Sequence, residues 1–291
     1  MKFNSPRQLK DWLRNKENSE GIPANTLINY YMMERLLERI SASRFRDMFI
    51  IKGGFLISSM IGINNRSTMD LDSTLKGIKI NETIVRTMMQ EILSIDLDDQ
   101  VVFQLIEIKS IHEISQYEDF RLTLKAHFFS MWTMLKVDLT TGDWIIPKEI
   151  DYDFKLMFED RAISLKAYNL QTILAEKIES ILSRNVLNTR ARDYYDVFSL
   201  LSIKKSEIKY SELLDALAKK TQERQTQRYL DRYSEYLDQI QKSPELRQIW
   251  SAYQKQYDYA KAISFDEIIT ILEKTLNNMM SGQNTSQQIG S

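Results

Sequence analysis

The spacing of apolar residues divides the chain into a mixed first half and a helical second half. Apolar positions that recur every three or four residues predict amphipathic helices at residues 6–18, 26–43, 55–61 and 82–94. Runs rich in β-branched and aromatic residues predict strands at residues 49–51, 68–75, 101–108, 121–129 and 134–139. From about residue 165 the spacing is helical almost to the end, and the clearest interior break is at Ser243 and Pro244.

These elements predict an α+β fold in which a mixed-sheet domain is followed by an α-helical domain. We expect the α/β domain, with its N-terminal helices, over residues 1–160 and the helical domain over residues 161–280. Residues 142–160 carry Pro147 and several acidic residues and are expected to connect the two. Residues 281–291 are polar and of low complexity, which predicts a flexible tail. The four tryptophans are expected to be packing residues: Trp12, Trp132, Trp144 and Trp250.

Composition narrows the chemistry that such a chain can carry. Cysteine is absent, which excludes disulfides, thiolate nucleophiles and cysteine zinc sites. Only two histidines are present, His112 and His127, so histidine-rich metal sites are not expected. The 40 acidic residues point instead to hard cations and phosphates. The amino terminus is charged and amphipathic, and no apolar run is long enough to span a bilayer, so we expect a cytoplasmic protein without a membrane segment.

Two aspartates in the first half are candidates for a metal site. Asp70 and Asp72 are two residues apart on a predicted strand, so their side chains point to the same face, about 7 Å apart along the strand. Like charges at that spacing are stabilised by a cation between them, and Mg²⁺ suits a few carboxylates together with substrate phosphates. For an isolated pair of this kind, the alternative is a strand end that faces solvent.

The residues around this pair favour the metal-site interpretation. Lys52, Gly53 and Gly54 join a predicted strand to a helix, where backbone without side chains lets amide groups approach a phosphate. Asp138 lies on another apolar strand. Three carboxylates on neighbouring strands, opposite a glycine turn, could hold two metal ions about 4 Å apart for phosphoryl or nucleotidyl transfer. A Gly-Gly pair alone is also a common turn.

In the helical half, one lysine and one aspartate fall on apolar helix faces. Lys177 projects within the apolar arc of residues 169–184, and Asp193 falls within the arc of residues 190–202. A charge directed at the body of the protein needs a partner or a ligand. The alternatives are a lysine that extends to the rim and a salt bridge or helix cap that ties the two helices together.

A local excess of positive charge predicts where RNA could bind. Residues 184–232 contain eleven Lys and Arg against seven Asp and Glu, although the whole chain has a net charge of −1. Tyr229 and Tyr233 lie beside four cations that recur at every fourth position and predict a basic stripe on one helix face: Lys220, Arg224, Arg228 and Arg232. The alternative is a solvated helix face.

The first half also carries a stretch that resembles the signature of the nucleotidyltransferase superfamily that includes DNA polymerase β: IIKGGFLISSMIGINNRSTMDLD. The resemblance is to the variant in AbiEii/AbiGii-type toxins of type IV abortive-infection toxin–antitoxin systems, where Lys-Gly-Gly replaces Gly-Ser and Arg-Ser or Arg-Thr precedes the Asp-x-Asp. Here two further residues stand between Ser67 and Asp70. The LAEK sequence that ends at Lys177 and the RARDYYD sequence of residues 190–196 resemble two further motifs of these toxins.

The resemblance implies a role for each of these positions. The catalytic residues would be Asp70, Asp72, Lys177 and Asp193, with Asp193 either a general base or the residue that orients the lysine. Two Mg²⁺ ions would be bound by Asp70, Asp72 and Asp138. The nucleotide would be bound by Lys52, Gly53, Gly54, Arg66, Ser67 and Lys177. Arg190 and Arg192 are expected to bind RNA together with the basic stripe, which is predicted from charge and spacing alone.

The resemblance also implies a polymerase β-like domain and a Mg²⁺-dependent toxin that transfers a nucleotide from an NTP to RNA. The implied acceptor is the 3′ end of tRNA, whose modification would block aminoacylation, translation and growth during abortive infection by phage. A cognate antitoxin would act without a stable complex. Two alternatives stay open: transfer to a small hydroxylated molecule such as an antibiotic, and a non-catalytic nucleotide-binding module.

Overall fold

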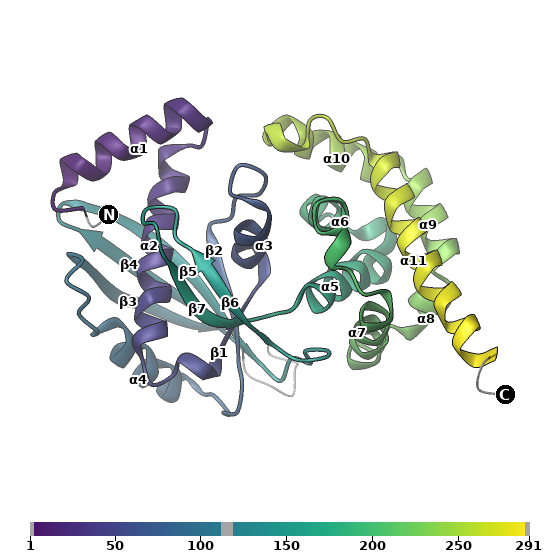
Figure 1. Ribbon diagram of the computed structural model, residues 1–291, viewed down its shortest axis with the longest axis horizontal. Helices are drawn as coiled ribbons and strands as arrows, with labels where there is room; N and C mark the ends of the chain where they lie inside the picture. The colour runs from purple at the N-terminus through teal and green to yellow at the C-terminus, as the bar shows by residue number, and fades with distance from the viewer. Residues whose placement is uncertain (1–2, 112–118, 289–291) are drawn as a thin grey trace. The chain divides into compact units, whose positions relative to one another are not determined.

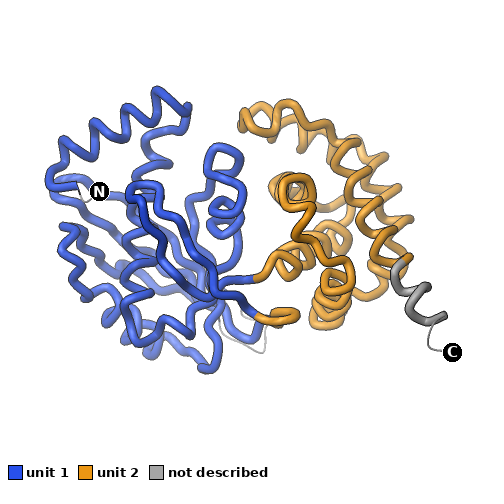
Figure 2. The backbone as a smooth tube through the Cα atoms, in the orientation of Figure 1, with its two compact units in different colours: residues 1–143, 149–168 blue, residues 144–148, 169–291 orange. Residues whose placement is uncertain are grey.

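The chain folds into two compact units, coloured separately in Figure 2. The computed structural model describes residues 3–111 and 119–288, with side chains as far as Ser281. Unit 1 comprises Met1–Asp143 and Glu149–Tyr168, and unit 2 comprises Trp144–Lys148 and Asn169–Ser291. His112 lies outside the described residues, as do the side chains of all but the first residue of the predicted flexible tail.

The described part of unit 1 contains a seven-stranded mixed sheet (Figure 1). Across the sheet the strand order is β3 (Val101–Ser110), β4 (Phe120–Phe128), β5 (Met131–Thr141), β2 (Asp70–Leu75), β1 (Phe49–Lys52), β7 (Ala162–Ala167) and β6 (Ile150–Lys155). The β2–β5 and β1–β7 pairs are parallel, and the other neighbours are antiparallel. The sheet is therefore mixed, as the α+β prediction requires.

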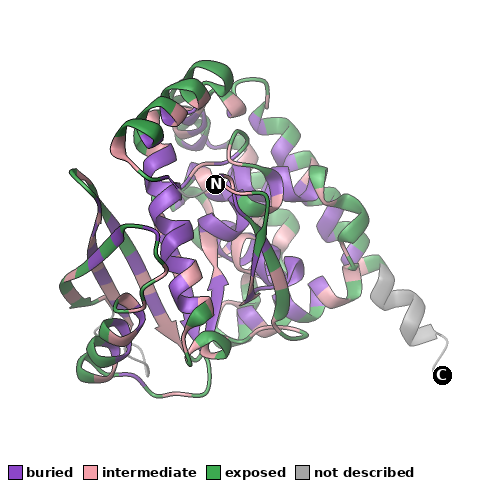
Figure 3. Ribbon diagram, turned by 60° about the vertical axis from the view of Figure 1, so that its left-hand side comes forward, coloured by how far each residue is buried: buried purple, intermediate pink, exposed green. Residues whose placement is uncertain are grey.

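Helices bury one face of this sheet. The helices of unit 1 are α1 (Pro6–Glu20), α2 (Ala24–Ala42), α3 (Gly53–Ile61) and α4 (Glu82–Leu93). Thirteen of the 19 residues of α2 are buried, because it packs against β5 and β7 and against α4 (Figure 3). Beneath these helices, alternate strand residues such as Leu71, Leu122 and Val137 are buried, whereas the residues between them project from the opposite face.

Unit 2 is helical. It contains α5 (Leu170–Arg184), α6 (Ala191–Ile203), α7 (Tyr210–Glu223), α8 (Gln227–Asp231), α9 (Tyr233–Lys242), α10 (Pro244–Gln256) and α11 (Phe265–Gln288). Asn169 caps α5 by accepting a hydrogen bond from the N–H of Thr172. Ser243 caps α10 in the same way, with Pro244 in its first turn, so the break predicted at these two residues is confirmed. Short 3₁₀ helices occur at Arg46–Met48, Asn185–Leu187, Lys205–Glu207 and Asp258–Ala260.

The structure differs from the prediction between the two halves. Residues 142–160, expected as a connector, contain β6, and the helical pattern expected from about residue 165 begins only after β7. β6 is an edge strand whose residues are mostly exposed, so it lacks the apolar alternation by which a strand is recognised. Among the described residues, no helix combines the length and the apolar character that crossing a bilayer demands.

Candidate active site

Four charged residues lie in register across the sheet of unit 1. Lys52 on β1 pairs with Asp72 on β2. Asp72 pairs with Asp138 on β5, which in turn pairs with Arg121 on β4. Residues paired in this way project from the same face, and so does Asp70, two residues before Asp72. The three aspartates predicted to bind metal therefore project from the same face of the sheet, opposite the buried leucines.

The carboxyl group of Asp72 occupies an environment that disfavours its charge. Burial raises its pKa, and the neighbouring charges of Asp138 and Asp70 raise it further. The ammonium of Lys52 and a hydrogen bond from the backbone N–H of Gly54 act in the opposite direction without cancelling the increase in pKa. A cation bound beside this carboxylate would relieve the unfavourable interactions.

Gly53 and Gly54 begin α3 against this carboxylate. Gly53 has a φ of +67°, and a Cβ there would lie 2.6 Å from Cγ of Asp72. A Cβ at Gly54 would lie 2.9 Å from Nη2 of Arg66 and 2.9 Å from Oγ1 of Thr68. The first turn of a helix offers N–H groups without partners in the helix, which can bind an anion. The two glycines therefore allow an anion-binding helix terminus to lie directly against a candidate metal ligand.

Asp70 and Asp72 are chemically suited to Mg²⁺. The Asp70 carboxylate makes neither a hydrogen bond nor an ion pair within the described part of the chain. Asp138 is held by Arg121 in a bidentate ion pair with N–O distances of 2.8 and 2.7 Å. No three carboxylates or histidines in residues 3–111 and 119–281 are already gathered closely enough to hold an ion. The donors present thus fit an ion held by a carboxylate pair and completed by substrate phosphates, which is the usual coordination of Mg²⁺.

The other residues predicted to bind the nucleotide in unit 1 have different surroundings. The Nζ atom of Lys52 donates to Oγ1 of Thr140 at 2.7 Å and pairs with Asp143 at 2.5 Å. Arg66 is fully buried, and its Nη1 donates to the carbonyl oxygen of the half-buried Ser67. The Nη2 atom of Arg66 lies 2.9 Å from the position that a Cβ at Gly54 would occupy, so the guanidinium lies against the first turn of α3, and its role in neutralising a phosphate stays a prediction.

In unit 2, Lys177 on α5 and two aspartates on α6 form a charged cluster. The Nζ atom of Lys177 lies 2.5 Å from Oδ1 of Asp193 and 3.1 Å from Oδ2 of Asp196. Ser180 donates its hydroxyl to the second carboxylate oxygen of Asp193 at 3.3 Å. Both aspartates are buried, whereas the lysine is partly exposed. The salt-bridge alternative considered for this pair is thus present, and it fixes the position of the lysine ammonium.

The basic stripe predicted on one helix face does not form, and that prediction is wrong. α7 ends at Glu223 and a separate helix begins at Gln227, so the four cations do not share a face. Lys220 is only 2% exposed and pairs with Glu176 at 3.2 Å and with Glu223 at 2.9 Å. It stabilises the helical unit and is not available to RNA.

The other cations predicted to bind RNA are spread over several elements. Arg224 pairs with the buried Glu179, and Arg232 donates to Glu235 at 3.0 Å. Arg228 lies over the ring of Tyr229, with its guanidinium carbon 4.7 Å from the ring centre. Arg192 donates to the hydroxyl of Tyr257 at 3.1 Å, and Arg190, at the start of α6, is exposed. Several of these charges are therefore already neutralised within unit 2.

Sequence reasoning missed three charged residues of these clusters. Arg121 lies in a strand of alternating polarity, and only the β4–β5 register shows that it faces Asp138. Asp143 follows a turn, and nothing in its local pattern connects it to Lys52. Asp196 lies at the edge of an apolar helix arc, where its complete burial is not apparent from spacing alone.

Two of the four tryptophans are not packing residues, so that prediction is wrong for them. Trp132 is 57% exposed and Trp144 is 52% exposed. A lysine lies over each ring: the Nζ atom of Lys125 is 4.8 Å from the ring centre of Trp132, and that of Lys219 is 4.0 Å from the ring centre of Trp144. Hydrophobicity alone predicts burial for an indole, but Trp132 lies on the open face of the sheet and Trp144 in the loop after β5, and both stay exposed.

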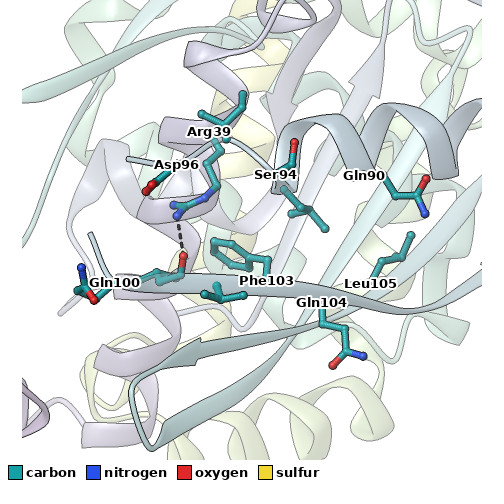
Figure 4. A pocket seen from close by; sticks show the side chains of 12 residues that line it. Arg39, Gln90, Ser94, Asp96, Gln100, Phe103, Gln104 and Leu105 are labelled. Atoms are coloured by element: carbon teal, nitrogen blue, oxygen red, sulfur yellow. Dashed lines mark hydrogen bonds between the residues drawn. The ribbon is translucent and has the colours of Figure 1, made fainter. Parts of the chain in front are cut away.

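A cavity of about 700 Å³ lies between α4 and β3 (Figure 4). Its lining includes Arg39, Gln90 and Phe103, and none of the residues predicted to bind metal or nucleotide contributes to it. Arg39 forms a buried ion pair with Asp99 at 2.8 Å and donates to the carbonyl oxygen of Val101 at 2.7 Å. These contacts join α2 to β3, so the arginine has a structural role.

Comparison with known proteins identifies a family for this chain. Residues 35–271 match the model of a family described as nucleotidyl transferase AbiEii toxin, type IV TA system. No curated protein matches the chain.

Three solved structures are similar to this chain to different degrees. A crystal structure from H. pylori, of a protein proposed to be a nucleotidyltransferase, has a TM-score of 0.50 at 14% identity and covers 89% of this chain and 98% of its own. The structure of JHP933 from Helicobacter pylori has a TM-score of 0.48 at 14% identity, with coverages of 91% and 98%. An antigenic nucleotidyltransferase-like protein from Paracoccidioides brasiliensis has a TM-score of 0.40 at 15% identity, with coverages of 67% and 88%. At these identities the likeness to the first structure concerns the fold alone.

Proposed function

Because the chain belongs to the AbiEii family of nucleotidyltransferase toxins from type IV toxin–antitoxin systems, we propose that it transfers a nucleotide from an NTP to RNA in a Mg²⁺-dependent reaction. Membership makes the chain a nucleotidyltransferase and implies a nucleotide substrate and an antitoxin partner. The acceptor in our proposal is the 3′ end of tRNA. A modified 3′ end would block aminoacylation and hence translation and growth, which is the effect required in abortive infection.

One observation carries the proposal: Asp70 and Asp72 share an open sheet face, and Asp72 lies directly against the glycines that begin α3. A triphosphate bound there would meet helix N–H groups on one side and carboxylates on the other. The carboxylates would repel it unless a divalent cation lay between them. Metal and nucleotide are thus expected to bind together.

Each residue then has a distinct task. Bound Mg²⁺ would neutralise charge that develops on the transferred phosphoryl group. Gly53 and Gly54 would let the backbone approach the phosphates, and Lys52, held by Thr140 and Asp143, would add a positive charge at a fixed position. In unit 2, both carboxylate oxygens of Asp193 already accept hydrogen bonds. We therefore favour an orienting role for Asp193, which would hold Lys177 ready for the nucleotide.

The proposal for the antitoxin is that it acts without a stable complex. It rests on the family resemblance, and co-purification tests it: a stable stoichiometric complex of the two proteins would contradict it.

Family membership favours the catalytic alternatives over a non-catalytic nucleotide-binding module.

The deciding experiment incubates the purified protein with total tRNA, Mg²⁺ and each labelled NTP in turn. We expect label in tRNA with at least one NTP and none when EDTA is present. Label that enters a polyhydroxylated antibiotic but no RNA would establish the small-molecule alternative. If neither acceptor is labelled by folded protein, the proposal is wrong.

The matched variants are Asp72→Asn and Asp151→Asn. Asp151 is also a strand aspartate, but it pairs with Lys166 on the exposed edge of the sheet. Since burial and neighbouring charges raise the pKa of Asp72, its neutral amide should fold at least as stably as the wild type. We therefore expect Asp72→Asn to lose transfer without losing stability, whereas Asp151→Asn keeps both.

A further inference from the structure

The open face of the unit 1 sheet continues beyond the aspartates onto β4 and β3. Asp70 pairs with Lys136 on β5. Two further rows follow along β5 on the same face: Met134, Lys125 and Gln104, and then Trp132, His127 and Val102. We call these six residues together with Lys136 the sheet platform. At about 3.3 Å per residue, it extends about 13 Å from the level of Asp70.

The sheet platform exposes large apolar side chains to solvent. Val102 is 65% exposed, Trp132 57% and Met134 39%. The ammonium of Lys125 lies 4.8 Å from the centre of the indole ring, which is a cation–π distance. The indole thus offers a flat aromatic surface bordered by a positive charge, and this combination binds single-stranded nucleic acid by stacking and charge attraction.

The charge of this region fits the same ligand. Lys125 and Lys136 project from the face, whereas Arg121 is paired with Asp138, and the one acidic side chain of the β3 rows on this face, Glu107, lies 3.0 Å from the ammonium of Lys109. Apart from the aspartates that would bind metal, the face is therefore positively charged. A purely apolar protein partner would gain nothing from these cations, whereas a polyanion with flat bases would use both features.

A cavity adjoins the sheet platform next to the aspartates. It has a volume of about 560 Å³, and its lining includes Trp132, Met134, Asn25 and Met69, the residue before Asp70. Sites for small molecules commonly have 300 to about 1,000 Å³. The exposed amide side chain of Asn25, at the rim of this cavity, could contact the polar edge of a base.

The geometry of phosphoryl transfer indicates that the acceptor binds on this side of the aspartates. The glycines that would receive the donor phosphates follow β1, on one side of the three aspartates. In the strand order, β4 and β3 lie on the other side, next to β5, which carries Asp138. An acceptor hydroxyl that reaches the same phosphate without colliding with the donor must come from that second side.

We propose that the single-stranded end of the acceptor RNA lies across the sheet platform, with a base stacked on Trp132 and phosphates near Lys125 and Lys136. The proposal rests on the function proposed above and locates its acceptor. Trp132 is a positioning residue, since it would hold the RNA without touching the reacting atoms. The cationic surface of this enzyme is then on the sheet and not on the helices at residues 220–232.

The test compares Trp132→Ala with Trp144→Ala, because both tryptophans are similarly exposed and each lies under a lysine. Loss of one stacked base is expected to raise KM for RNA about 5- to 100-fold while KM for the NTP stays unchanged. Trp144→Ala should change neither value more than about twofold. Equal KM values for RNA in both variants would overturn the proposal while leaving the transferase activity, and hence the proposed function, intact.

Charge reversal provides a second readout. Lys125→Glu should weaken RNA binding and reduce the slope of log Kd against log salt concentration by about 0.7 per lost phosphate contact, as expected for single strands. Lys219→Glu is the matched control, since that lysine also lies over an indole. An unchanged slope in Lys125→Glu would contradict the proposal.

A third measurement does not depend on activity. Thr123 on β4 pairs with Lys136 of the sheet platform and so projects from the same face. The chain has no cysteine, so Thr123→Cys and Lys219→Cys on α7 each allow one photocrosslinker to be attached. We expect crosslinks to tRNA from position 123 and not from 219. Crosslinks only from 219, or a crosslink from position 123 to a protein antitoxin in place of RNA, would show that the platform has another occupant and overturn the proposal.

Discussion

Alanine at Gly53 tests whether the glycine turn exists to hold Asp72 in place. The backbone there has a φ of +67°, which costs an L-residue about 1–2 kcal/mol. The new methyl group would lie 2.6 Å from Cγ of Asp72 and 2.8 Å from its Cβ. Since carbon atoms pack at about 3.5–4.0 Å, the carboxylate must retreat by about 1 Å.

These two effects can be separated with Gly21. Its φ is +70°, and no atom lies within 4 Å of a Cβ placed there. Gly21→Ala therefore carries the backbone cost alone, about 1–2 kcal/mol. Gly53→Ala carries the same cost and about 1–3 kcal/mol of overpacking.

The consequence for activity is larger than the consequence for stability. A displacement of about 1 Å in a catalytic group can cost on the order of 100-fold in rate. We expect Gly53→Ala to reduce nucleotide transfer by about that factor, and Gly21→Ala to leave the rate within about twofold of wild type. Urea denaturation gives the two stabilities, and label transfer at saturating NTP and Mg²⁺ gives the two rates. Similar rates in the two folded variants would refute the claim that the glycine positions Asp72.

Three further predictions concern other buried charges. Asp196→Asn should destabilise the protein by about 1–3 kcal/mol in urea denaturation, because it removes a buried partner of Lys177; unchanged stability would contradict this. Burial raises the pKa of Glu34 to about 7, so stability should fall as pH rises from about 4.5 to 7. Glu34→Gln should reduce that loss of stability by up to about 3 kcal/mol. Identical slopes of stability against pH in both proteins would refute the raised pKa of Glu34. Lys220→Met should lower stability by about 2 kcal/mol because it leaves Glu176 and Glu223 without their shared cation; its KM for RNA should not change, and an increased KM would restore a role in RNA binding.

The sequence was sufficient to predict the elements that bury an apolar face. α2, α4, α5 and α6 follow the predicted helical spacing closely, because each packs one side against a core. β6 and β7 were not predicted as strands: β6 lies at the sheet edge with few buried residues, and β7 is read as the start of a helical pattern. The pairing of β7 with β1 is a long-range choice that no local window contains.

The candidate site could be predicted only where chemistry and spacing coincide. Asp70 and Asp72 are visible because alternation on a strand places both on one face. Arg121 is not visible, since its partner lies 17 residues away on another strand. The basic stripe failed for the opposite reason: a four-residue repeat looks like one helix face, but a helix end after Glu223 breaks the repeat.

Buried charges in this protein are of two kinds: those that are neutralised by other residues of the chain and those that are not. Lys220 lies between two carboxylates, and Arg39 is matched to Asp99, so each of these cations is compensated by the protein itself. Such clusters are complete, and removing one member leaves an unpaired charge. Along the unit 1 sheet, by contrast, Asp72 lies between Lys52 and Asp138, with Asp70 nearby, and its pKa is raised in spite of the lysine. We expect a ligand to supply the missing positive charge there, because carboxyl groups with perturbed pKa values are concentrated at functional sites; electrostatic incompleteness, more than the presence of charge, would then separate the site from the scaffold.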